Sequence, residues 1–479
     1  MQAVTPTILW VPGAVVLVGI VIGLVAEASG RRSFGIATIA AGLLVAAAVS
    51  GWSALETTVS LVFGGLLLGG GGFSGLACVV YVLAGLSILS GWSRATSTQR
   101  GGTVAGLTAL SAVGIQVLAS SFDLLTAVLA LEIVAIAGYA LVSATGSRRS
   151  DEAAMRYFVQ GGTATGFTVL GLAVLYGVYG YSGYTELVAA IGTGSQSAAF
   201  GMVLVLAAFA FKLGAVPFHS WAPDVFETTD ASSAGFLASA PKIGALMALL
   251  VLFPGGIFNE GRFPGATLAI ATIAAASVVL GNVGALRQRS LGRMLGYSGI
   301  AQVGYGLIGV AAGVGGITAT AVFAVTYAVG AAAAFFVAEA VRVRRPDWDG
   351  TIAGLSGLAA EAPVLAAGMT VAVLSLTGMP LMIGFWGKLL VFSAAVSVNL
   401  TWLAVVGVIG SVISFGYYGS VIRSMYAAPQ EAGEGSPGGE LAGGRMAFTV
   451  ALVAMIAVII GGTGPVIAGV DVLFRLLTF

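Results

Sequence analysis

Long apolar stretches recur along this chain from one end to the other, and they constrain its fold more than any other feature. Each stretch is about twenty residues long, enough for an α-helix to cross a hydrocarbon core about 30 Å thick. Charged residues make up only 8% of the 479 residues, about a third of their usual share in a soluble domain. The sequence therefore predicts an all-α, polytopic membrane protein embedded in the lipid bilayer.

We predict fourteen transmembrane helices. They are placed at about residues 8–27, 34–51, 73–92, 103–120, 122–145, 155–178, 198–218, 231–253, 264–286, 293–312, 315–341, 363–396, 400–426 and 446–470. The twelfth span is long for one crossing, and Gly378, Pro380 and Gly384 in its middle predict a broken helix. Pro217 predicts a similar break near the end of the seventh span.

The distribution of arginine supports this count. If both termini lie outside, fifteen of the twenty cationic residues fall in the alternate, cytoplasmic loops. They are Arg31, Arg32, Arg94, Arg100, Arg148, Arg149, Arg156, Arg287, Arg289, Arg293, Arg342, Arg344, Arg345, Arg423 and Arg445. The opposite loops contain only Arg262 and Arg475. A miscounted helix would scramble this alternation, so the positive-inside rule predicts fourteen spans with both ends outside.

A weak internal symmetry divides the chain. Spans 4–8 contain a helix with a buried acid and then a helix broken near a lysine and a proline, and spans 9–13 contain another helix broken in this way. Because five is an odd number of crossings, two such repeats would have opposite orientations, as in many transporters. We therefore predict N-terminal helices 1–3 at 1–102, a first repeat at 103–253, an inverted second repeat at 254–426, and a polar tether with helix 14 at 427–479.

Several kinds of chemistry lack the residues they need. Cys78 is the only cysteine and His219 the only histidine, so the chain supplies no ligand set for an iron–sulfur cluster, a thiolate zinc site or a haem. The loops are too short to hold a nucleotide-binding domain. We therefore expect no cofactor and no metal on this chain, and the net charge of +1 gives no indication of a nucleic-acid partner.

The only three lysines are the main indication of function. Lys212, Lys242 and Lys388 each lie in an apolar window, where a charged side chain at the bilayer centre costs about 2.5–3.5 kcal/mol. Lysines near helix ends can instead extend to the membrane surface. However, Lys242 lies in mid-span, and the other two lie beside helix breaks, where polar backbone can hold water. Arginine stays protonated, whereas a buried lysine can bind and release a proton, so we predict proton translocation.

Glu132 is the fourth candidate. It lies near the middle of the fifth span, with no other charged residue within eight positions. A carboxylate there needs a cationic partner, and Lys212 is our candidate; the alternative is an ion pair that only holds two helices together. Glu339 and Asp471 lie close to span ends and are expected to be solvated.

Possible relay residues lie between the lysines. His219 either relays protons between Lys212 and Lys242 or has a structural role at a helix end. Tyr297, Ser298, Gln302 and Tyr305 are polar positions along the tenth span and are candidates for the lining of a wet path.

Six segments carry a family resemblance from about Gly102 to Arg423. They are LEIVAIAGYAL, DEAAMRYFVQGG, FKLGAVPFHSWAPDVFE, PKIGAL, RMLGYSGIAQVGY and GMPLMIGFWGKLLVF. In this order and spacing they resemble the antiporter-like subunits of respiratory complex I, in particular the subunit N family of bacterial proton-translocating NADH–quinone oxidoreductases. The N-terminal hundred residues are similar in hydropathy and helix count only.

The resemblance implies a non-redox subunit of a translocase in the bacterial plasma membrane, between a small K-like subunit and antiporter-like subunit M. It implies an acid–lysine pair, Glu132 and Lys212, a central Lys242 and a distal Lys388 along a hydrated axis. It also implies that NADH, FMN, iron–sulfur clusters and quinone are bound by other subunits, whose quinone reduction drives proton translocation electrostatically or conformationally.

Two positions depart from the family pattern. Gly292 precedes Arg293 where the family commonly has a lysine, and Gln302 stands where it commonly has a histidine. Glutamine cannot titrate, so a proton crossing from Lys242 to Lys388 would need water or tyrosines instead. Two alternatives remain open, a subunit of a multisubunit cation/proton antiporter and a structural paralogue that does not pump.

Overall fold

The computed structural model describes residues 10–55, 60–191, 195–252, 263, 265–428, 449–450 and 453. Within these residues the fold is almost entirely helical. The first half contains α1 (Val11–Ala28), α2 (Arg32–Ser53), α3 (Gly71–Ser90), α4 (Trp92–Ser97), α5 (Gly101–Ser120), α6 (Leu124–Ala144), α7 (Arg148–Tyr179), α8 (Tyr184–Ala190), α9 (Gln196–Leu213), α10 (Trp221–Thr228) and α11 (Ala231–Leu252). The second half contains α12 (Ala266–Leu286), α13 (Leu291–Ala311), α14 (Ile317–Arg344), α15 (Leu358–Glu361), α16 (Pro363–Thr377), α17 (Ile383–Ser397) and α18 (Thr401–Tyr426).

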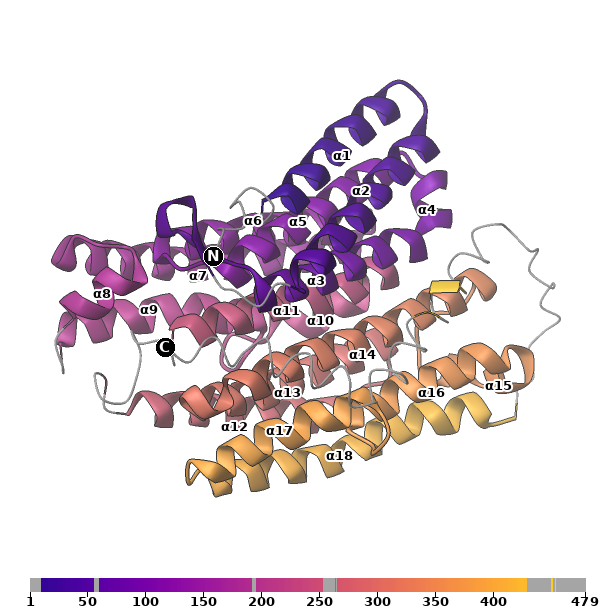
Figure 1. The fold of residues 1–479 in the computed structure, drawn as a ribbon. Coiled ribbons are helices and arrows are strands. Elements are labelled where there is room, and N and C mark those ends of the chain that lie inside the picture. The colour runs from indigo at the N-terminus through magenta and orange to yellow at the C-terminus, as the bar shows by residue number, and fades with distance from the viewer. Residues whose placement is uncertain are drawn as a thin grey trace.

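The long helices lie side by side in one bundle, with the N-terminal half packed against the C-terminal half (Figure 1). The loops with most of the arginines meet at the end where α4 and α15 lie, which we call the arginine-rich end. α11 crosses the middle of the bundle with its whole span buried, whereas most of α1 and α7 is exposed to the surroundings. These exposed faces carry valine, leucine, isoleucine and phenylalanine, as expected for helices in a bilayer.

Twelve helices of the described residues are long and apolar enough to cross a membrane. The shorter α16 and α17 occupy the predicted span at 363–396. Apart from residues 449–450 and 453, the predicted span at 446–470 lies outside the residues that the structure describes, as do Arg445, Asp471 and Arg475. The sequence did not predict a small antiparallel hairpin, β1 (Ser60–Val62) and β2 (Leu67–Gly69), which precedes α3.

Two of the crossings are interrupted, as the sequence predicts. α9 ends at Leu213, where Gly214 adopts a left-handed conformation with φ of 73°, and Pro217 lies in the loop before α10. α16 ends at Gly378 in the same manner, with φ of 90°, before the segment with Pro380. A β-carbon in this conformation would be strained, so glycine can end each helix here.

Gly384 has a different role from the predicted one. It lies inside the first turn of α17, and a β-carbon there would overlap the carbonyl oxygen of Ser375 in α16. Gly384 therefore allows α16 and α17 to pack closely after the chain has turned.

Glu339 corrects another expectation. Its position near the end of a span predicts a solvated side chain, yet only 1% of the residue is exposed. One carboxylate oxygen accepts a hydrogen bond of 3.0 Å from Arg94 of α4, and the same guanidinium pairs with Asp230 before α11. α14 continues for another turn beyond Glu339 and packs against α3. The tertiary packing thus buries a carboxylate that the chain order places near an end.

Candidate functional site

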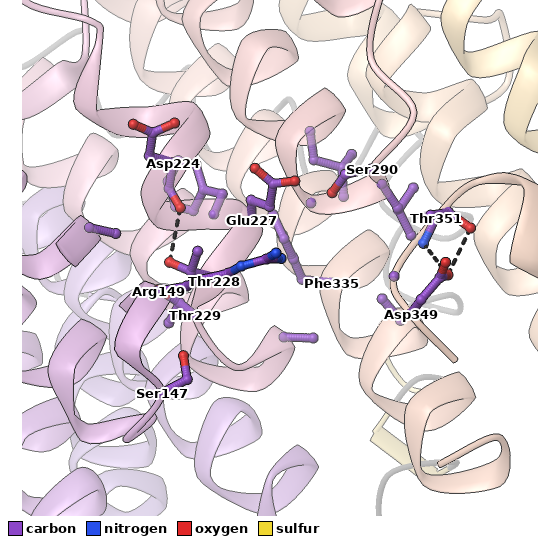
Figure 2. Close-up of a pocket in the computed structure, with 18 of the residues that line it drawn as sticks. Ser147, Arg149, Asp224, Glu227, Thr228, Thr229, Ser290, Phe335, Asp349 and Thr351 are labelled. Atoms are coloured by element: carbon purple, nitrogen blue, oxygen red, sulfur yellow. Dashed lines mark hydrogen bonds between the residues drawn. The ribbon is translucent and has the colours of Figure 1, made fainter. Parts of the chain in front are cut away.

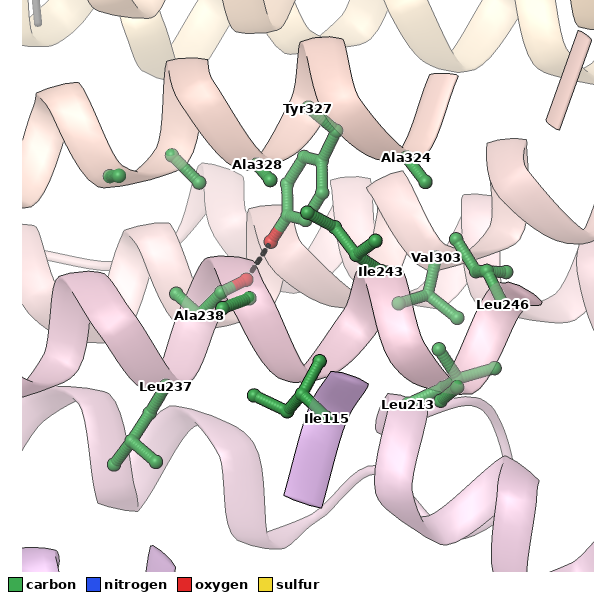
Figure 3. Packing of buried hydrophobic residues seen from close by; sticks show 14 of the residues in the cluster. Ile115, Leu213, Leu237, Ala238, Ile243, Leu246, Val303, Ala324, Tyr327 and Ala328 are labelled. Carbon is green, nitrogen blue, oxygen red and sulfur yellow. Dashed lines mark hydrogen bonds between the residues drawn. The ribbon is translucent and has the colours of Figure 1, made fainter. Parts of the chain in front are cut away.

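Lys242 lies at the centre of the bundle, in the middle of α11. Only 4% of the residue is exposed. Its ammonium group donates hydrogen bonds to the hydroxyl oxygen of Tyr327, 2.9 Å away, and to the carbonyl oxygen of Gly299, 3.2 Å away. The Tyr327 hydroxyl in turn donates to the carbonyl oxygen of Ala238 on α11, so α14 and α11 are joined at this point (Figure 3). The ring centres of Phe226 and Tyr327 lie 6.0 and 5.0 Å from the ammonium nitrogen, and the ammonium group depends on these few oxygens for its hydrogen bonds.

Lys388 lies in α17, next to the second helix break, with 5% of the residue exposed. Its ammonium group donates to the carbonyl oxygen of Thr377, 2.9 Å away in the last turn of α16, and to the hydroxyl oxygen of Ser411, 3.2 Å away. It also lies 4.4 Å from the centre of the Tyr305 ring, close enough for a cation–π interaction. The break thus supplies a free helix-end carbonyl oxygen as a ligand for the ammonium group.

Hydroxyl and amide groups lie near these two lysines, and we call them the polar row. Its members are Tyr327, Ser298, Tyr418, Tyr417, Asn282 and Tyr305. Ser298 and Tyr418 share a hydrogen bond, the Tyr417 hydroxyl donates to Asn282 at 3.1 Å, and the Asn282 amide donates to Tyr305 at 3.2 Å. Tyr417 and Tyr418 are neighbours whose ring centres lie 4.5 Å apart.

Lys212 and Glu132 do not form an ion pair in the described structure. The ammonium group of Lys212 is buried without a hydrogen-bond partner, although the Glu132 carboxylate is near enough to attract it electrostatically. That carboxylate accepts a hydrogen bond of 2.7 Å from Thr165 of α7. A local hydroxyl group therefore holds the acid, and the lysine keeps its place at the end of α9 through packing. Trp221, whose indole N–H donates to the Phe211 carbonyl oxygen, covers that end.

The remaining predicted residues differ in how close they lie to the lysines and the polar row. Gln302 is buried, and its amide donates to the carbonyl oxygen of Leu376 beside the second break, 2.7 Å away. Tyr297 lies nearer the arginine-rich end and is near the guanidinium of Arg293. His219 lies half-buried in the first break and its ring nitrogen contacts the Pro217 carbonyl oxygen, with no hydrogen bond to a lysine in the described structure.

Sequence reasoning missed Tyr327, Asn282, Ser411, Tyr417 and Tyr418. The available signal was weak, because a tyrosine or serine in an apolar helix is common. Asn282 was the best candidate, since it is the only amide side chain in α12.

A cavity of about 630 Å³ opens at the arginine-rich end, and we call it the vestibule (Figure 2). It is lined by residues of α7, α10, α13 and α14 and by the loop after α14. Asp349 lies on this loop, where the backbone N–H and then the hydroxyl of Thr351 donate to its carboxylate at 2.9 and 2.7 Å. These bonds hold the pKa of Asp349 below its usual range. The vestibule is therefore charged and accessible to water at neutral pH.

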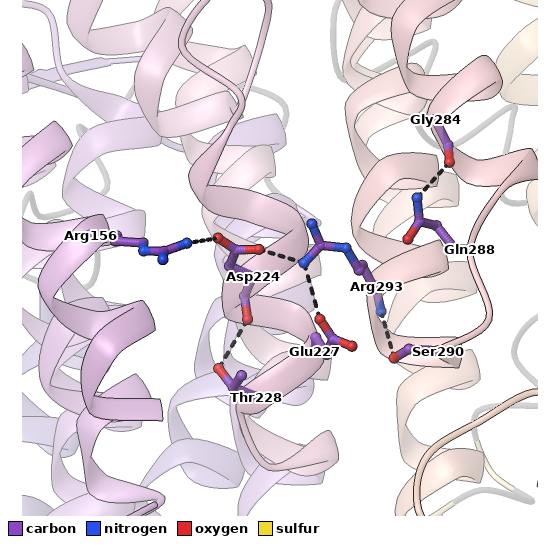
Figure 4. A network of polar contacts seen from close by, with 8 residues as sticks. All are labelled: Arg156, Asp224, Glu227, Thr228, Gly284, Gln288, Ser290 and Arg293. Atoms are coloured by element: carbon purple, nitrogen blue, oxygen red, sulfur yellow. Dashed lines mark hydrogen bonds and ion pairs between the residues drawn. The ribbon is translucent and has the colours of Figure 1, made fainter. Parts of the chain in front are cut away.

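An ion-pair network crosses the wall of the vestibule (Figure 4). Asp224 of α10 accepts hydrogen bonds from Arg156 of α7 at 2.9 Å and from Arg293 of α13 at 2.5 Å. The same nitrogen of Arg293 lies 3.0 Å from Glu227. One carboxylate thus ties α10 to a helix on each side.

Buried ammonium groups with polar side chains beside them, in a bundle with two interrupted helices, define a class of protein, the antiporter-like membrane proteins. Comparison with known families agrees. Residues 121–414 match the family model described as the transmembrane region of NADH:quinone oxidoreductases and Mrp antiporters. The chain belongs to this family.

Individual relatives are similar over most of the chain. NADH-quinone oxidoreductase subunit N of Sphingopyxis alaskensis is 36% identical, over 93% of this chain and 94% of its own. A chain of respiratory complex I from Thermus thermophilus has a TM-score of 0.74 and 26% identity, over 95% of this chain and 98% of its own. A chain of the Mrp complex from Dietzia sp. shares the fold, with a TM-score of 0.80 and 21% identity over 98% of each chain.

Proposed function

We propose that this chain is a membrane-arm subunit of an NADH–quinone oxidoreductase of the complex I type, and that it translocates protons through Glu132, Lys212, Lys242 and Lys388. The observation that carries the proposal is the burial of three lysines, two of which have members of the polar row beside them. Proton exchange needs groups that titrate and neighbours that can pass a proton through hydrogen bonds. A hydroxyl group can both donate and accept a hydrogen bond. Proton transfer along the polar row therefore does not need a histidine at position 302.

The roles of the individual residues follow from their surroundings. Glu132 controls the charge of Lys212 by approaching it or remaining with Thr165. Lys242 receives the proton at the centre of the bundle, and Lys388 releases it toward the end opposite the arginine-rich one. We propose that the helix breaks beside Lys212 and Lys388 provide the polar backbone that solvates each ammonium group. His219 stays a candidate for the surface end of the first half.

The wider assembly is part of the same proposal. The chain binds no redox group, and NADH, FMN, iron–sulfur clusters and quinone are held by other subunits. A K-like small subunit and a subunit of the M type lie on either side in the bacterial plasma membrane. The arginine-rich end faces the cytoplasm, following the positive-inside rule, and both termini lie outside.

The test is proton pumping together with quinone reduction in membrane vesicles containing the whole complex. Lys242→Ala, Lys212→Ala and Glu132→Gln are each expected to lower the number of protons pumped per quinone reduced. Lys242→Arg is the informative comparison, because it keeps a positive charge but cannot release a proton. If Lys242→Arg pumps as well as the natural chain, a fixed positive charge is sufficient at this position. The proposal that Lys242 exchanges a proton would then be wrong.

A cation/proton antiporter subunit is the second candidate, because the matching family also contains Mrp antiporters. It predicts sodium- or potassium-coupled proton movement in vesicles without NADH. A non-pumping paralogue would leave pumping unchanged in Lys242→Ala. Membranes energised by NADH and by a sodium gradient separate the three possibilities.

A further inference from the structure

One aromatic side chain lies between the vestibule and the central lysine. Phe226 of α10 lines the vestibule, and its ring centre is 6.0 Å from the ammonium nitrogen of Lys242. Phe335 of α14, which also lines the vestibule, has its ring centre 5.9 Å from that of Phe226. Both residues are almost fully buried. The charged cavity therefore ends at a pair of rings, and the ammonium group lies directly behind one of them.

The helix that carries Phe226, α10, packs closely against two glycines of α13. A β-carbon at Gly292 would overlap the carbonyl oxygen of Phe226, and one at Gly296 would lie 2.8 Å from the α-carbon of Pro223. The backbone of α10 therefore packs directly on α13 at these positions. This accounts for the departure at position 292, because a lysine there would displace α10 and the Phe226 ring with it.

Asp224 fixes the same helix from its outer side. Its two oxygens bind Arg156 and Arg293, which belong to the helices on either side of α10. The guanidinium of Arg156 is more than half exposed and that of Arg293 about one third, so both ion pairs are accessible to vestibule water. Pairs of this kind are individually weak and can be exchanged for water. The ion pairs of Asp224 can therefore break and form again, whereas the close packing on Gly292 and Gly296 determines the position to which α10 returns.

We propose that α10 is a gate between the vestibule and Lys242, with Phe226 as its seal and the Asp224 ion pairs as its latch. The inference rests on the proposed function, since it assigns the route by which Lys242 is protonated. With the gate closed, the apolar rings exclude water from the path to the amine. When α10 moves away, water enters, a hydronium ion gives its proton to the neutral amine, and water and a charged Lys242 remain.

The gate can be tested without measuring proton pumping. Lys242→Cys, combined with Cys78→Ser, gives a single thiol on this chain behind the seal. Inside-out vesicles containing the whole complex are treated with a trimethylammonium methanethiosulfonate, which does not cross the membrane, and modification of position 242 is followed by mass spectrometry. Adding Phe226→Ala is expected to raise the modification rate about tenfold or more, because removing the ring hydrates the constriction.

Phe323→Ala is the matched control. It removes the same ring from a buried position stacked on Tyr327, with ring centres 6.2 Å apart, but it does not line the vestibule. The modification rate of Lys242→Cys should be the same with and without Phe323→Ala. Equal acceleration by Phe226→Ala and Phe323→Ala would mean general loosening and would overturn the gate, as would no acceleration by Phe226→Ala.

A second variant covers the case in which Phe226→Ala does not assemble. Asp224→Asn keeps the ring but removes the latch, and modification should again become faster; an unchanged rate overturns the proposal. The outcome is independent of the function assigned above. Pumping that survives Lys242→Ala would contradict the proposed function, whereas a modification rate insensitive to both gate variants would contradict only the gate.

Discussion

The hydroxyl oxygen of Tyr327 lies 2.9 Å from the ammonium nitrogen of Lys242, and the same hydroxyl donates to the carbonyl oxygen of Ala238. The tyrosine thus bonds to the central lysine and to the helix that carries it. A proton that leaves Lys242 is accepted by the Tyr327 hydroxyl, whose own proton points toward the carbonyl oxygen of Ala238.

Tyr327→Phe should therefore impair pumping while leaving the packing almost intact. A hydrogen bond to a buried charged group contributes about 1.5–3 kcal/mol, which corresponds to a decrease in the pumping rate of about tenfold or more. The rate of proton pumping, with quinone reduction followed in parallel, is the measurement. Tyr81→Phe is the control, because it removes a buried hydroxyl that is bonded to Gln116 and not to a lysine in the described structure. Equal pumping by both variants would contradict a role for Tyr327.

The polar row predicts different effects for two neighbouring amides. Asn282 joins Tyr417 to Tyr305, whereas Gln302 binds the Leu376 carbonyl oxygen. Asn282→Ala should consequently lower proton pumping more strongly than Gln302→Ala. The comparison is made in the same vesicles and normalised to quinone reduction. If Gln302→Ala is the more damaging change, protons pass through position 302 and the polar row is not the route.

Gly292→Ala tests the seat of α10. The added β-carbon would overlap the Phe226 carbonyl oxygen, so α10 must move outward and the thiol of Lys242→Cys should react faster with the charged reagent. Gly177→Ala is the control, because no atom lies within 4 Å of a β-carbon there. A slower or unchanged reaction in Gly292→Ala would show that α10 does not need this glycine.

Arg94→Ala should destabilise the chain more than the loss of any surface ion pair. It leaves the buried carboxylate of Glu339 without its cation, and breaking a buried pair in this way costs about 3–5 kcal/mol. Arg148→Ala, which breaks an exposed pair with Glu152, should cost about 0–1 kcal/mol. Thermal melting of the solubilised complex is the measurement. Adding Glu339→Gln to Arg94→Ala should restore part of the loss; no recovery would mean that Arg94 acts through another contact.

The contact between α14 and α15 has a defined pH dependence. Burial raises the pKa of Glu361, but hydrogen bonds and charge from Arg345 and then Arg344 outweigh it and hold this pKa below its ordinary value. The stabilisation is therefore fully present above the unfolded pKa of about 4.3 and is lost as the pH falls through the lower, folded value. Hydrogen exchange of residues 346–361, corrected for intrinsic rates, should show equal protection at pH 7 and pH 5. Glu361→Gln should lower it at both.

The positions of the crossings in the described residues, and of both breaks, could be predicted from the sequence, since hydropathy, glycine and proline act locally. The three lysines were also identifiable, because a cation in an apolar window is visible without any tertiary contact. The hairpin before α3 was missed, since its two strands have three residues each and sit between apolar spans.

The sequence by itself therefore determined the number of apolar segments in the described range, their order, and which ionisable groups they carry. Only the tertiary structure decided which partners those groups have. Glu132 binds Thr165 where Lys212 was expected, Glu339 is buried and pairs with Arg94 of α4, and Asn282 joins two tyrosines from different helices. The physical reason is that hydrogen bonds act over about 3 Å, and contacts at that range between helices depend on packing that no pattern within one helix encodes.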